Sequence, residues 1–426
     1  MPGKRRIFYG WWMVGAAIIL NIFAGGTFVY GITVFFNPIR NTFGWSAAVT
    51  AIAFTLQRFE SGVFEVVAGY LVDKVGPRKL MLCGWIVVGL GFLMMSRVDS
   101  LWAFYGSFLI IAMGMSFAVF IVIFTTIANW FDKKRSRALT LVVTGFGVSG
   151  TLVPLVALAV GELGWRETLV IVGIAAWVIG IPLSSLMRHK PSQYGYLPDG
   201  DSIDTVDEPA SVPDFQSTSE TAEQNTGSST TGFTAKAALR TRAFWLLASA
   251  SLFQFTGASA IMVHIVPYLE SVGILRTLAA TIVTGVTICS LIGRLGFGFI
   301  GDFANKRHLI AIGITLQTVG IFIFSFIDMD RMWLIIPFLL TYAPGFGATI
   351  PLRPALQADY FGTANFGTIM GLMMLASMAG GLASPIVAGW IFDVTGSYHL
   401  AWQLFALISI PAIPIILLAK PPRTSD

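Results

Sequence analysis

The chain alternates long apolar segments with short polar loops. Twelve apolar segments of about 19 to 29 residues follow one another, at roughly 9–36, 46–71, 80–98, 101–129, 138–161, 165–187, 243–269, 275–300, 308–327, 332–352, 366–391 and 399–419. A helix of about 20 apolar residues spans the hydrocarbon core of a bilayer. The pattern therefore predicts an all-α polytopic membrane protein with twelve transmembrane helices.

The composition supports a lipid environment. Hydrophobic residues make up 55% of the 426 residues and charged residues 12%, about half the share of charged residues in an ordinary soluble domain. The formal net charge is +5, but most basic residues stand in loops between apolar segments, so we expect no nucleic-acid partner. Cys83 and Cys289 lie far apart in apolar segments and indicate neither a disulfide framework nor a metal motif.

The distribution of lysine and arginine predicts the orientation. The loops and tails on the side of the N-terminus hold 20 of the 27 basic residues, and those on the other side hold five. Short cytoplasmic loops carry the excess of basic residues in membrane proteins. We therefore expect a multi-pass protein of a plasma membrane or bacterial inner membrane, with both termini in the cytoplasm.

One connection differs from the short loops. Residues 188–242 include an acidic stretch rich in Ser and Thr, with few large apolar residues. Such a composition buries too little surface to fold, so we expect a flexible cytoplasmic linker. It separates two units of six helices each, residues 1–187 and 243–426.

The two units carry matching sequences. GYLVDKVGPRK at 69–79 is echoed by GFIGDFANKRH at 298–308, an offset of 229 residues. ANWF at 128–131 is echoed by ADYF at 358–361, an offset of 230 residues. Two echoes at nearly one offset predict a duplicated architecture of two pseudo-symmetric six-helix bundles.

Parallel six-helix repeats and the loop after the second segment resemble the major facilitator superfamily. The superfamily's loop signature is matched position by position by Gly69, Asp73, Gly76, Arg78 and Lys79. The resemblance implies that this loop helps to latch the two halves together in the outward-open state. Its echo in the second half supplies the corresponding residues, which are Gly298, Asp302 and Arg307.

A second stretch resembles one group within that superfamily. WFDKKRSRALTLVVTGFG at 130–147 is similar to the loop and fifth helix of monocarboxylate carriers and oxalate/formate-type antiporters. The resemblance implies a monomeric carrier that moves a small organic anion by alternating access, together with a proton. The chain departs from the animal carriers in having no Lys in helix one, and Ser290 where they place an Asp.

Arg294 is the first candidate for the substrate site. It stands eight residues before Asp302, about 12 Å from the end of its helix at 1.5 Å per residue. Its position matches the arginine of the eighth helix with which monocarboxylate carriers hold the substrate carboxylate. A guanidinium suits that role because its planar fork binds a carboxylate through two hydrogen bonds. The alternative is a structural ion pair between helices.

Three charges share the second apolar segment. Arg58 and Glu65 are seven residues apart and lie on one helix face with Gly62 and Gly69, whereas Glu60 points elsewhere. Small residues allow a neighbouring helix to approach closely, and we expect that helix to come from the other half.

The repeat offset makes Glu65 the counterpart of Arg294. We therefore hypothesise that Glu65 or Glu60 balances Arg294 in the empty carrier. A substrate anion would displace that carboxylate, which would then take up a proton because low dielectric favours its neutral form. The alternative is a permanent structural network of these charges.

Three further side chains are candidates for contact with substrate. His264 is a candidate because histidine is a common proton or ligand group in proteins, although a histidine in such a position can equally be a hydrogen-bonded packing residue. Tyr30 falls opposite His264 by pseudo-symmetry, and Tyr342 stands beside a Pro and two Gly residues at which helix ten could bend.

The sequence offers no sign of an enzyme. GFGVSG at 145–150 has glycine spacing typical of a nucleotide-binding loop, but it lies inside an apolar segment with no strand before it. We expect no cofactor and no metal. Two other functions stay open: transport of a neutral or amphipathic solute with structural charges, and a membrane receptor without transport.

Overall fold

The computed structural model describes residues 8–45, 60, 63–200 and 232–422. Its N-terminal half contains α1 (Tyr9–Ala24), α2 (Ile32–Phe43), a helix at 63–75, α4 (Pro77–Ser96), α5 (Leu101–Ala118), α6 (Phe120–Trp130), α7 (Arg135–Val148), α8 (Val153–Leu163) and α9 (Trp165–Ser185). Its C-terminal half contains α10 (Ala235–Arg240), α11 (Arg242–Ser271), α12 (Arg276–Ile300), α13 (Lys306–Phe324), α14 (Ile335–Phe361), α15 (Phe366–Thr395), α16 (His399–Ser409) and α17 (Ala412–Leu418).

Within the described residues, 11 helical stretches are long and apolar enough to cross a membrane. They correspond to the predicted segments except the second, most of which lies outside the described residues. The largest difference in length is at helix ten, predicted over 332–352 and observed over Met332–Phe361. It continues through Pro351 and Pro354, since neighbouring helices can satisfy the backbone groups that proline frees.

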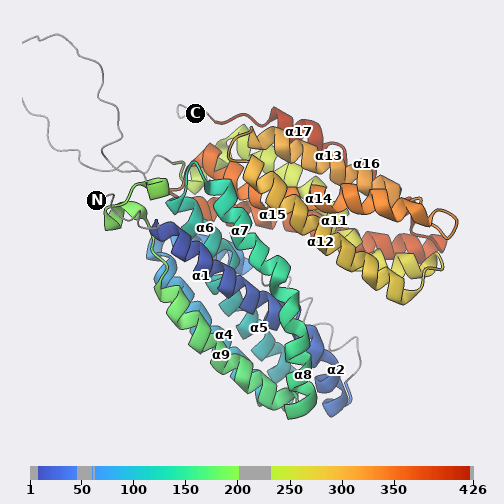
Figure 1. The fold of residues 1–426 in the computed structure, drawn as a ribbon, viewed down its shortest axis with the longest axis horizontal. Coiled ribbons are helices and arrows are strands. Elements are labelled where there is room, and N and C mark those ends of the chain that lie inside the picture. The colour runs from blue at the N-terminus through green and yellow to red at the C-terminus, as the bar shows by residue number, and fades with distance from the viewer. Residues whose placement is uncertain (1–7, 46–59, 61–62, 201–231, 423–426) are drawn as a thin grey trace, which may run out of the picture.

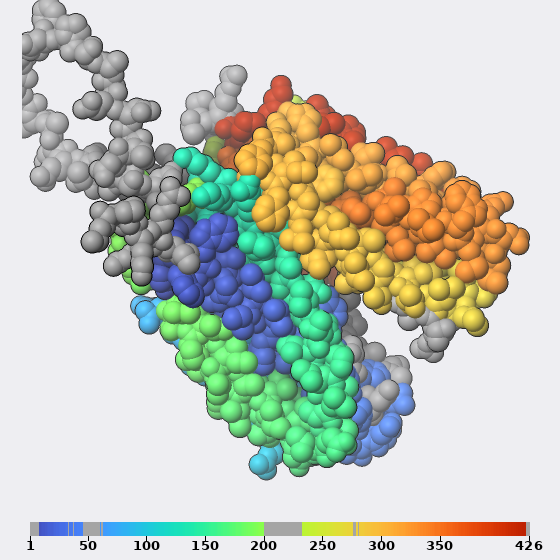
Figure 2. Space-filling view, viewed as in Figure 1, coloured from blue at the N-terminus to red at the C-terminus, as the bar shows by residue number. Residues whose placement is uncertain are grey.

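The two halves meet at one end of the molecule and diverge at the other (Figures 1 and 2). The start of α1 and the helix α17 lie at the end where the halves meet, which we call the linker end. In the views of both figures, α8 and the start of α12 lie at the opposite, separated ends of the two halves.

Each half has its own apolar packing. Buried side chains of α1, α4, α5, α6 and α7 form one cluster, which continues across the interface to Ala355, Ala358, Phe366 and Met370 of the C-terminal half. In the C-terminal half an aromatic group forms the corresponding core, with Phe324 stacked on Phe338 at 4.6 Å and Phe338 on Tyr342 at 5.3 Å between ring centroids. Because these cores are closely packed, each half is rigid, and relative motion of the halves has to occur at the contacts between them.

Small residues bring helices of the two halves into close contact. A Cβ atom at Gly69 would overlap the carbonyl oxygen of Gly367 in α15, and one at Gly371 would lie 2.9 Å from the carbonyl oxygen of Glu65. On the other side of the interface, a Cβ at Gly298 would overlap the side chain of Thr140. The expected close approach at Gly69 by a helix of the other half is confirmed, while Gly62 lies outside the described residues.

Both ends of the predicted flexible linker are structured, which differs from the expectation for 188–242. The indole of Trp130 donates to the carbonyl oxygen of Arg188 at 2.9 Å, and Tyr196 packs on the same indole. At the other end, the backbone N–H of Phe233 donates to the carbonyl oxygen of Phe361 at 2.9 Å. Aromatic side chains explain this order, because they give each end apolar surface to bury.

The crossing at Gly69 gives a testable prediction. Replacing Gly69 by Ala should lower the melting temperature in detergent, because relieving the overlap with Gly367 costs roughly 1–3 kcal/mol of overpacking. Gly106→Ala is the matched control, since a Cβ there would meet nothing within 4 Å. Equal melting temperatures for the two variants would contradict the close crossing.

Candidate functional site

Asp73 binds the N-terminus of a helix from the other half. Its carboxylate accepts hydrogen bonds from the backbone N–H groups of Gly367 at 3.1 Å and Thr368 at 2.8 Å, and from the Thr368 hydroxyl at 2.8 Å. The first N–H groups of a helix have no partner within the helix and carry its positive dipole end. Asp73 therefore joins the helix at 63–75 to α15 by charge-assisted hydrogen bonds.

The echo of this motif makes the same kind of contact in the opposite direction. Asp302, just after α12, accepts a hydrogen bond from the backbone N–H of Ser136 at 2.9 Å, at the start of α7. Its other oxygen lies 3.0 Å from Nε of Arg137, at an angle that makes this an ion pair without a hydrogen bond. The duplication thus gives two carboxylates, each bound to a helix start of the other half.

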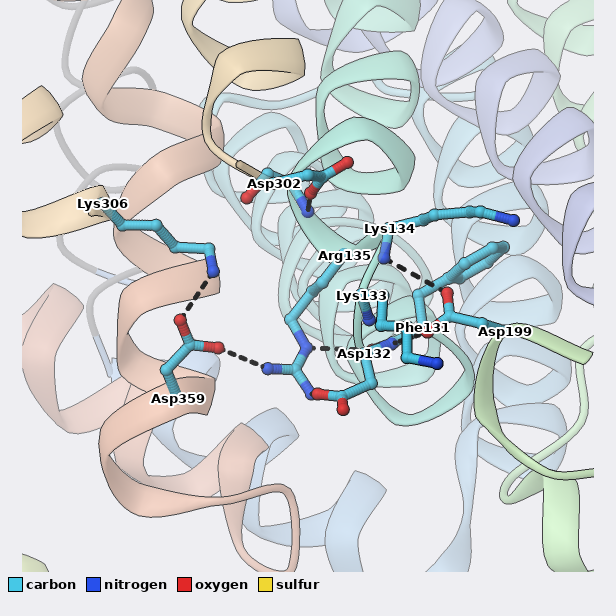
Figure 3. Close-up of polar contacts among 10 residues, drawn as sticks. Phe131, Asp132, Lys133, Lys134, Arg135, Asp199, Asp302, Lys306 and Asp359 are labelled. Carbon is cyan, nitrogen blue, oxygen red and sulfur yellow. Dashed lines mark hydrogen bonds and ion pairs between the residues drawn. The ribbon is translucent and has the colours of Figure 1, made fainter. Parts of the chain in front are cut away.

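A third contact between the halves is centred on Arg135 (Figure 3). Its guanidinium donates to Asp359 at 2.7 Å across the interface, to Asp132 at 3.1 Å and to the carbonyl oxygen of Phe131 at 2.9 Å. Lys306 binds the second oxygen of Asp359 at 2.7 Å. The sequence placed Arg135 in a basic run, but only the structure shows that it bridges the halves.

Asp199 holds the loop that carries Arg135 (Figure 3). Its carboxylate accepts the backbone N–H groups of Asp132, Lys133 and Lys134 at 3.0, 2.6 and 3.2 Å. Asp199 has a φ of 61°, a left-handed conformation that is uncommon outside glycine. No local pattern signals this contact, because the loop and Asp199 are 65 to 67 residues apart.

The remaining predicted latch residues lie at the linker end without joining the halves. Gly76, with a φ of 86°, precedes α4 and makes the turn out of the helix at 63–75. Arg78 and Lys79 are exposed. Arg307 donates to the carbonyl oxygen of Ala419 at 3.2 Å, inside the C-terminal half. Among the described basic residues, Arg137 and not Arg307 is the partner of Asp302.

Arg294 lies at the interface with helices of the N-terminal half. A Cβ at Gly147 of α7 would be 3.6 Å from Nη1 of Arg294, and the Tyr30 hydroxyl is within electrostatic range of the guanidinium. Tyr30 follows a π-helical turn, Gly25–Val29, and its side chain is 47% exposed. The structure thus brings together two of the predicted substrate contacts, Arg294 and Tyr30.

The expected ion pair of Arg294 is not formed. In the described part of the chain, no carboxylate lies within ion-pair distance of Arg294, and its Nε is buried without a hydrogen-bond partner. Glu65 lines a separate cavity beside α15, because the close contact at Gly371 holds it there. Glu60 is buried, and Arg58 lies outside the described residues.

The cavity beside Glu65 has a volume of about 430 Å³. Most of its wall comes from α11, α14 and α15, and its residues are largely apolar. Glu65 is contributed by the N-terminal half and Arg353 by α14, and these are the two charged residues among those that line it. The cavity therefore lies where the two halves meet.

The predicted tenth segment ends at residue 352 and leaves Arg353 in the following loop. In the structure it stands inside α14, eight residues before the end of that helix at Phe361. The echo of ANWF by ADYF contained the signal, because helix ten should end at ADYF as helix four ends at ANWF. Pro351 and Pro354, on either side of Arg353, favour a helix that ends before Arg353, because proline usually interrupts a helix.

His264 and Tyr342 are both bound within the C-terminal half. Nε2 of His264 lies 2.9 Å from the carbonyl oxygen of Pro385, which can only accept, so Nδ1 accepts from the Tyr398 hydroxyl at 3.2 Å. Tyr342 is 1% exposed, and its hydroxyl lies 3.5 Å from the carbonyl oxygen of Ala258. These contacts favour the packing interpretation that the sequence left open for His264.

Long apolar helices arranged in two halves define a polytopic membrane protein. The sequence profile of the Major Facilitator Superfamily matches residues 14–274 and 247–426, and the chain belongs to that superfamily. It is therefore a membrane transporter and not an enzyme, as expected.

Known transporters are similar in sequence to this chain along most of their length. The chain is 24% identical to monocarboxylate transporter 12 of Mus musculus over 425 residues, covering 94% of this chain and 84% of the relative. It is 26% identical to the oxalate:formate antiporter of Oxalobacter formigenes over 393 residues, covering 89% and 86%. The predicted resemblance to this group of carriers is confirmed.

Solved structures support the fold. The proton:xylose symporter XylE bound to 6-bromo-6-deoxy-D-glucose superposes with a TM-score of 0.73 at 12% identity, covering 97% of this chain and 96% of that chain. The E. coli fucose:proton symporter FucP superposes with a TM-score of 0.65 at 14% identity, covering 97% and 98%. At such identities the likeness shows the major facilitator fold alone.

The surroundings of Asp73 predict a pH dependence of stability. Burial raises the pKa of Asp73 to about 6, although hydrogen bonds from Thr368 and Gly367 favour its charged form. A folded-state pKa above the ordinary value gives a contribution to stability that is present at low pH and lost as the pH rises through about 6. Melting temperatures of the wild type and Asp73→Asn, measured from pH 5 to 7.5, test this.

The variant cannot ionise, so the wild type should lose stability relative to Asp73→Asn across that range. A constant difference between the two proteins from pH 5 to 7.5 would show that Asp73 does not titrate there. Comparing the two proteins at each pH removes the contribution of other titrating groups, which both share.

Proposed function

We propose that this protein is a secondary active transporter that moves a small organic anion across the membrane by alternating access of its two halves. The observation that carries the proposal is Arg294, a guanidinium at the interface of the halves with no carboxylate partner in the described part of the chain. A charge in low dielectric is costly unless it is paired. A substrate anion would supply that partner.

The position of Arg294 suits a carrier. It lies about 12 Å from Asp302 along the helix, at 1.5 Å per residue. Tyr30 is the second proposed substrate contact, since its hydroxyl can donate a hydrogen bond to an anion bound at Arg294. His264 and Tyr342 would act by packing α11 and α14 within the C-terminal half, because their polar atoms already have partners there.

The named relatives support the substrate class. They include monocarboxylate transporters 12 and 13 and an oxalate:formate antiporter, whose names specify monocarboxylates, oxalate and formate. We infer a monocarboxylate-like substrate, and symport of a proton through Glu65. In this scheme Glu65 takes up a proton from water as the anion binds, before the cavity between the halves closes, because low dielectric then favours its neutral form.

The orientation follows from the distribution of charge. The linker end carries the basic loops, so it would face the cytoplasm together with both termini. The halves meet at that end and diverge at the other, so the structure would correspond to the outward-facing state of a cell-membrane carrier.

The anion site can be tested by substitution of Arg294. In proteoliposomes, Arg294→Gln should lower exchange of labelled lactate, pyruvate or formate by about tenfold or more, since a hydrogen bond to a charged group contributes roughly 1.5–3 kcal/mol. Arg331→Gln is the matched control, because Arg331 lies exposed in a loop away from the interface. Wild-type exchange in Arg294→Gln would refute the assignment.

Proton coupling can be tested separately from binding. Glu65→Gln should abolish uptake driven by an imposed pH gradient and retain counterflow exchange, because exchange needs no net movement of protons. Glu162→Gln is the matched control, because it makes the same substitution at an exposed position of α8, outside the proposed site. Persistent gradient-driven uptake in Glu65→Gln would exclude Glu65 as the coupling residue.

A further inference from the structure

Two unused hydrogen-bond donors face the cavity beside Glu65. Nη2 of Arg353 and the amide nitrogen of Gln357 are both buried without a hydrogen-bond partner in the part of the chain that the structure describes. Both residues line the cavity, and they stand four residues apart on α14, hence on one face of the helix. Buried donors are normally satisfied, so two unsatisfied ones at one cavity point to a missing acceptor.

A polar network fixes the helices that carry these donors. The amide of Gln254 in α11 donates to Gln317 of α13 at 2.6 Å and to the hydroxyl of Thr349 in α14 at 3.0 Å. Thr349 stands one helical turn before Arg353, so the network holds the register of α14 where Arg353 enters the cavity. The donors are therefore positioned before a ligand arrives, which lowers the entropic cost of binding.

The rest of the cavity is apolar and adaptable. Met370, Met373, Met374 and Met378 of α15 line one side, and Phe255 and Leu382 also contribute to the wall. Methionine side chains adjust to ligands of different shape. A volume of about 430 Å³ falls within the range of small-molecule pockets and exceeds the needs of a two-carbon acid.

The charges on the wall determine which acid can enter. Arg353 and Glu65 are the charged residues that line the cavity, and Glu60 acts on Glu65 electrostatically. The lining residues of α6, α11 and α15 contain no acidic or basic group. A second carboxylate beside an ionised Glu65 would leave excess negative charge in apolar surroundings. The ligand therefore fits when Glu65 is protonated and donates a hydrogen bond to it.

We infer that this cavity is a second carboxylate-binding site, in which Arg353 and Gln357 bind the carboxylate of an acid whose branched aliphatic or aromatic group occupies the methionine-lined part. The site is separate from Arg294, which lies against α7 on the other side of the interface. This inference rests on the proposed function in taking the ligand to be a transported organic anion. It extends that function to acids with bulky apolar groups.

Calorimetric titration of the purified protein with phenylacetate, 4-methylpentanoate and formate tests the site. We expect wild-type protein to bind the two bulky acids, and Arg353→Gln to bind them about tenfold more weakly. Arg331→Gln should bind as the wild type does. Ser377→Phe adds bulk to the apolar wall and leaves Arg353 in place. It should therefore weaken the binding of the two bulky acids and leave the binding of formate unchanged.

Protonation of Glu65 gives an independent measurement. Titrations in two buffers with different ionisation enthalpies should show about one proton taken up per phenylacetate bound by the wild type, and none by Glu65→Gln. Melting curves of each variant identify a protein that fails to fold, in which case the size selectivity of Ser377→Phe decides alone.

The outcomes separate the two proposals. Phenylacetate binding that survives Arg353→Gln but is lost in Arg294→Gln would overturn the second site and leave the proposed function intact. The second site would also be overturned if Ser377→Phe weakened the binding of formate and of phenylacetate equally. Wild-type protein that neither binds nor exchanges any of these acids would overturn the proposed function itself.

Discussion

The cost of keeping a charge away from water controls the arrangement of this protein. At the linker end that cost is partly offset across the interface, where Asp73 and Asp302 accept hydrogen bonds from the starts of helices in the other half. The same cost is not offset at Arg294 and Arg353, which have no carboxylate partner among the described residues. The satisfied charges hold the halves together, and the unsatisfied ones are where a ligand can bind.

The closure at the linker end and the proposed sites are mechanically connected. Asp73 and Glu65 belong to one helix, and that helix contacts α15 at Gly367 and again at Gly371 beside Glu65. Because the contact is tight, separation of α15 from this helix has to displace Glu65 from the wall of its cavity. Opening of the linker end thus changes the environment of the proposed proton carrier, which is the coupling that a symporter needs.

The sequence predicted the elements that depend on local pattern and repetition. The apolar segments, the cross-half contact at Gly69 and the paired Asp73 and Asp302 motifs follow from segment length, glycine spacing and one repeat offset. Arg353 was misplaced because proline usually ends a helix in water, whereas α14 continues inside the bundle. The expected pairing of Arg294 with Glu65 failed because equal depth in two repeats does not place two side chains in one cavity.

The sequence by itself determined the class of the protein, its duplicated halves and the spans that the structure describes, since hydrophobic length and periodic repetition act along the chain. Only the tertiary structure decided which charges meet. Arg135 is 224 residues from Asp359, and Glu65 reaches a cavity whose other walls come from the opposite half. Such partners are selected by the packing of one bundle against the other, through contacts between residues that no local pattern links.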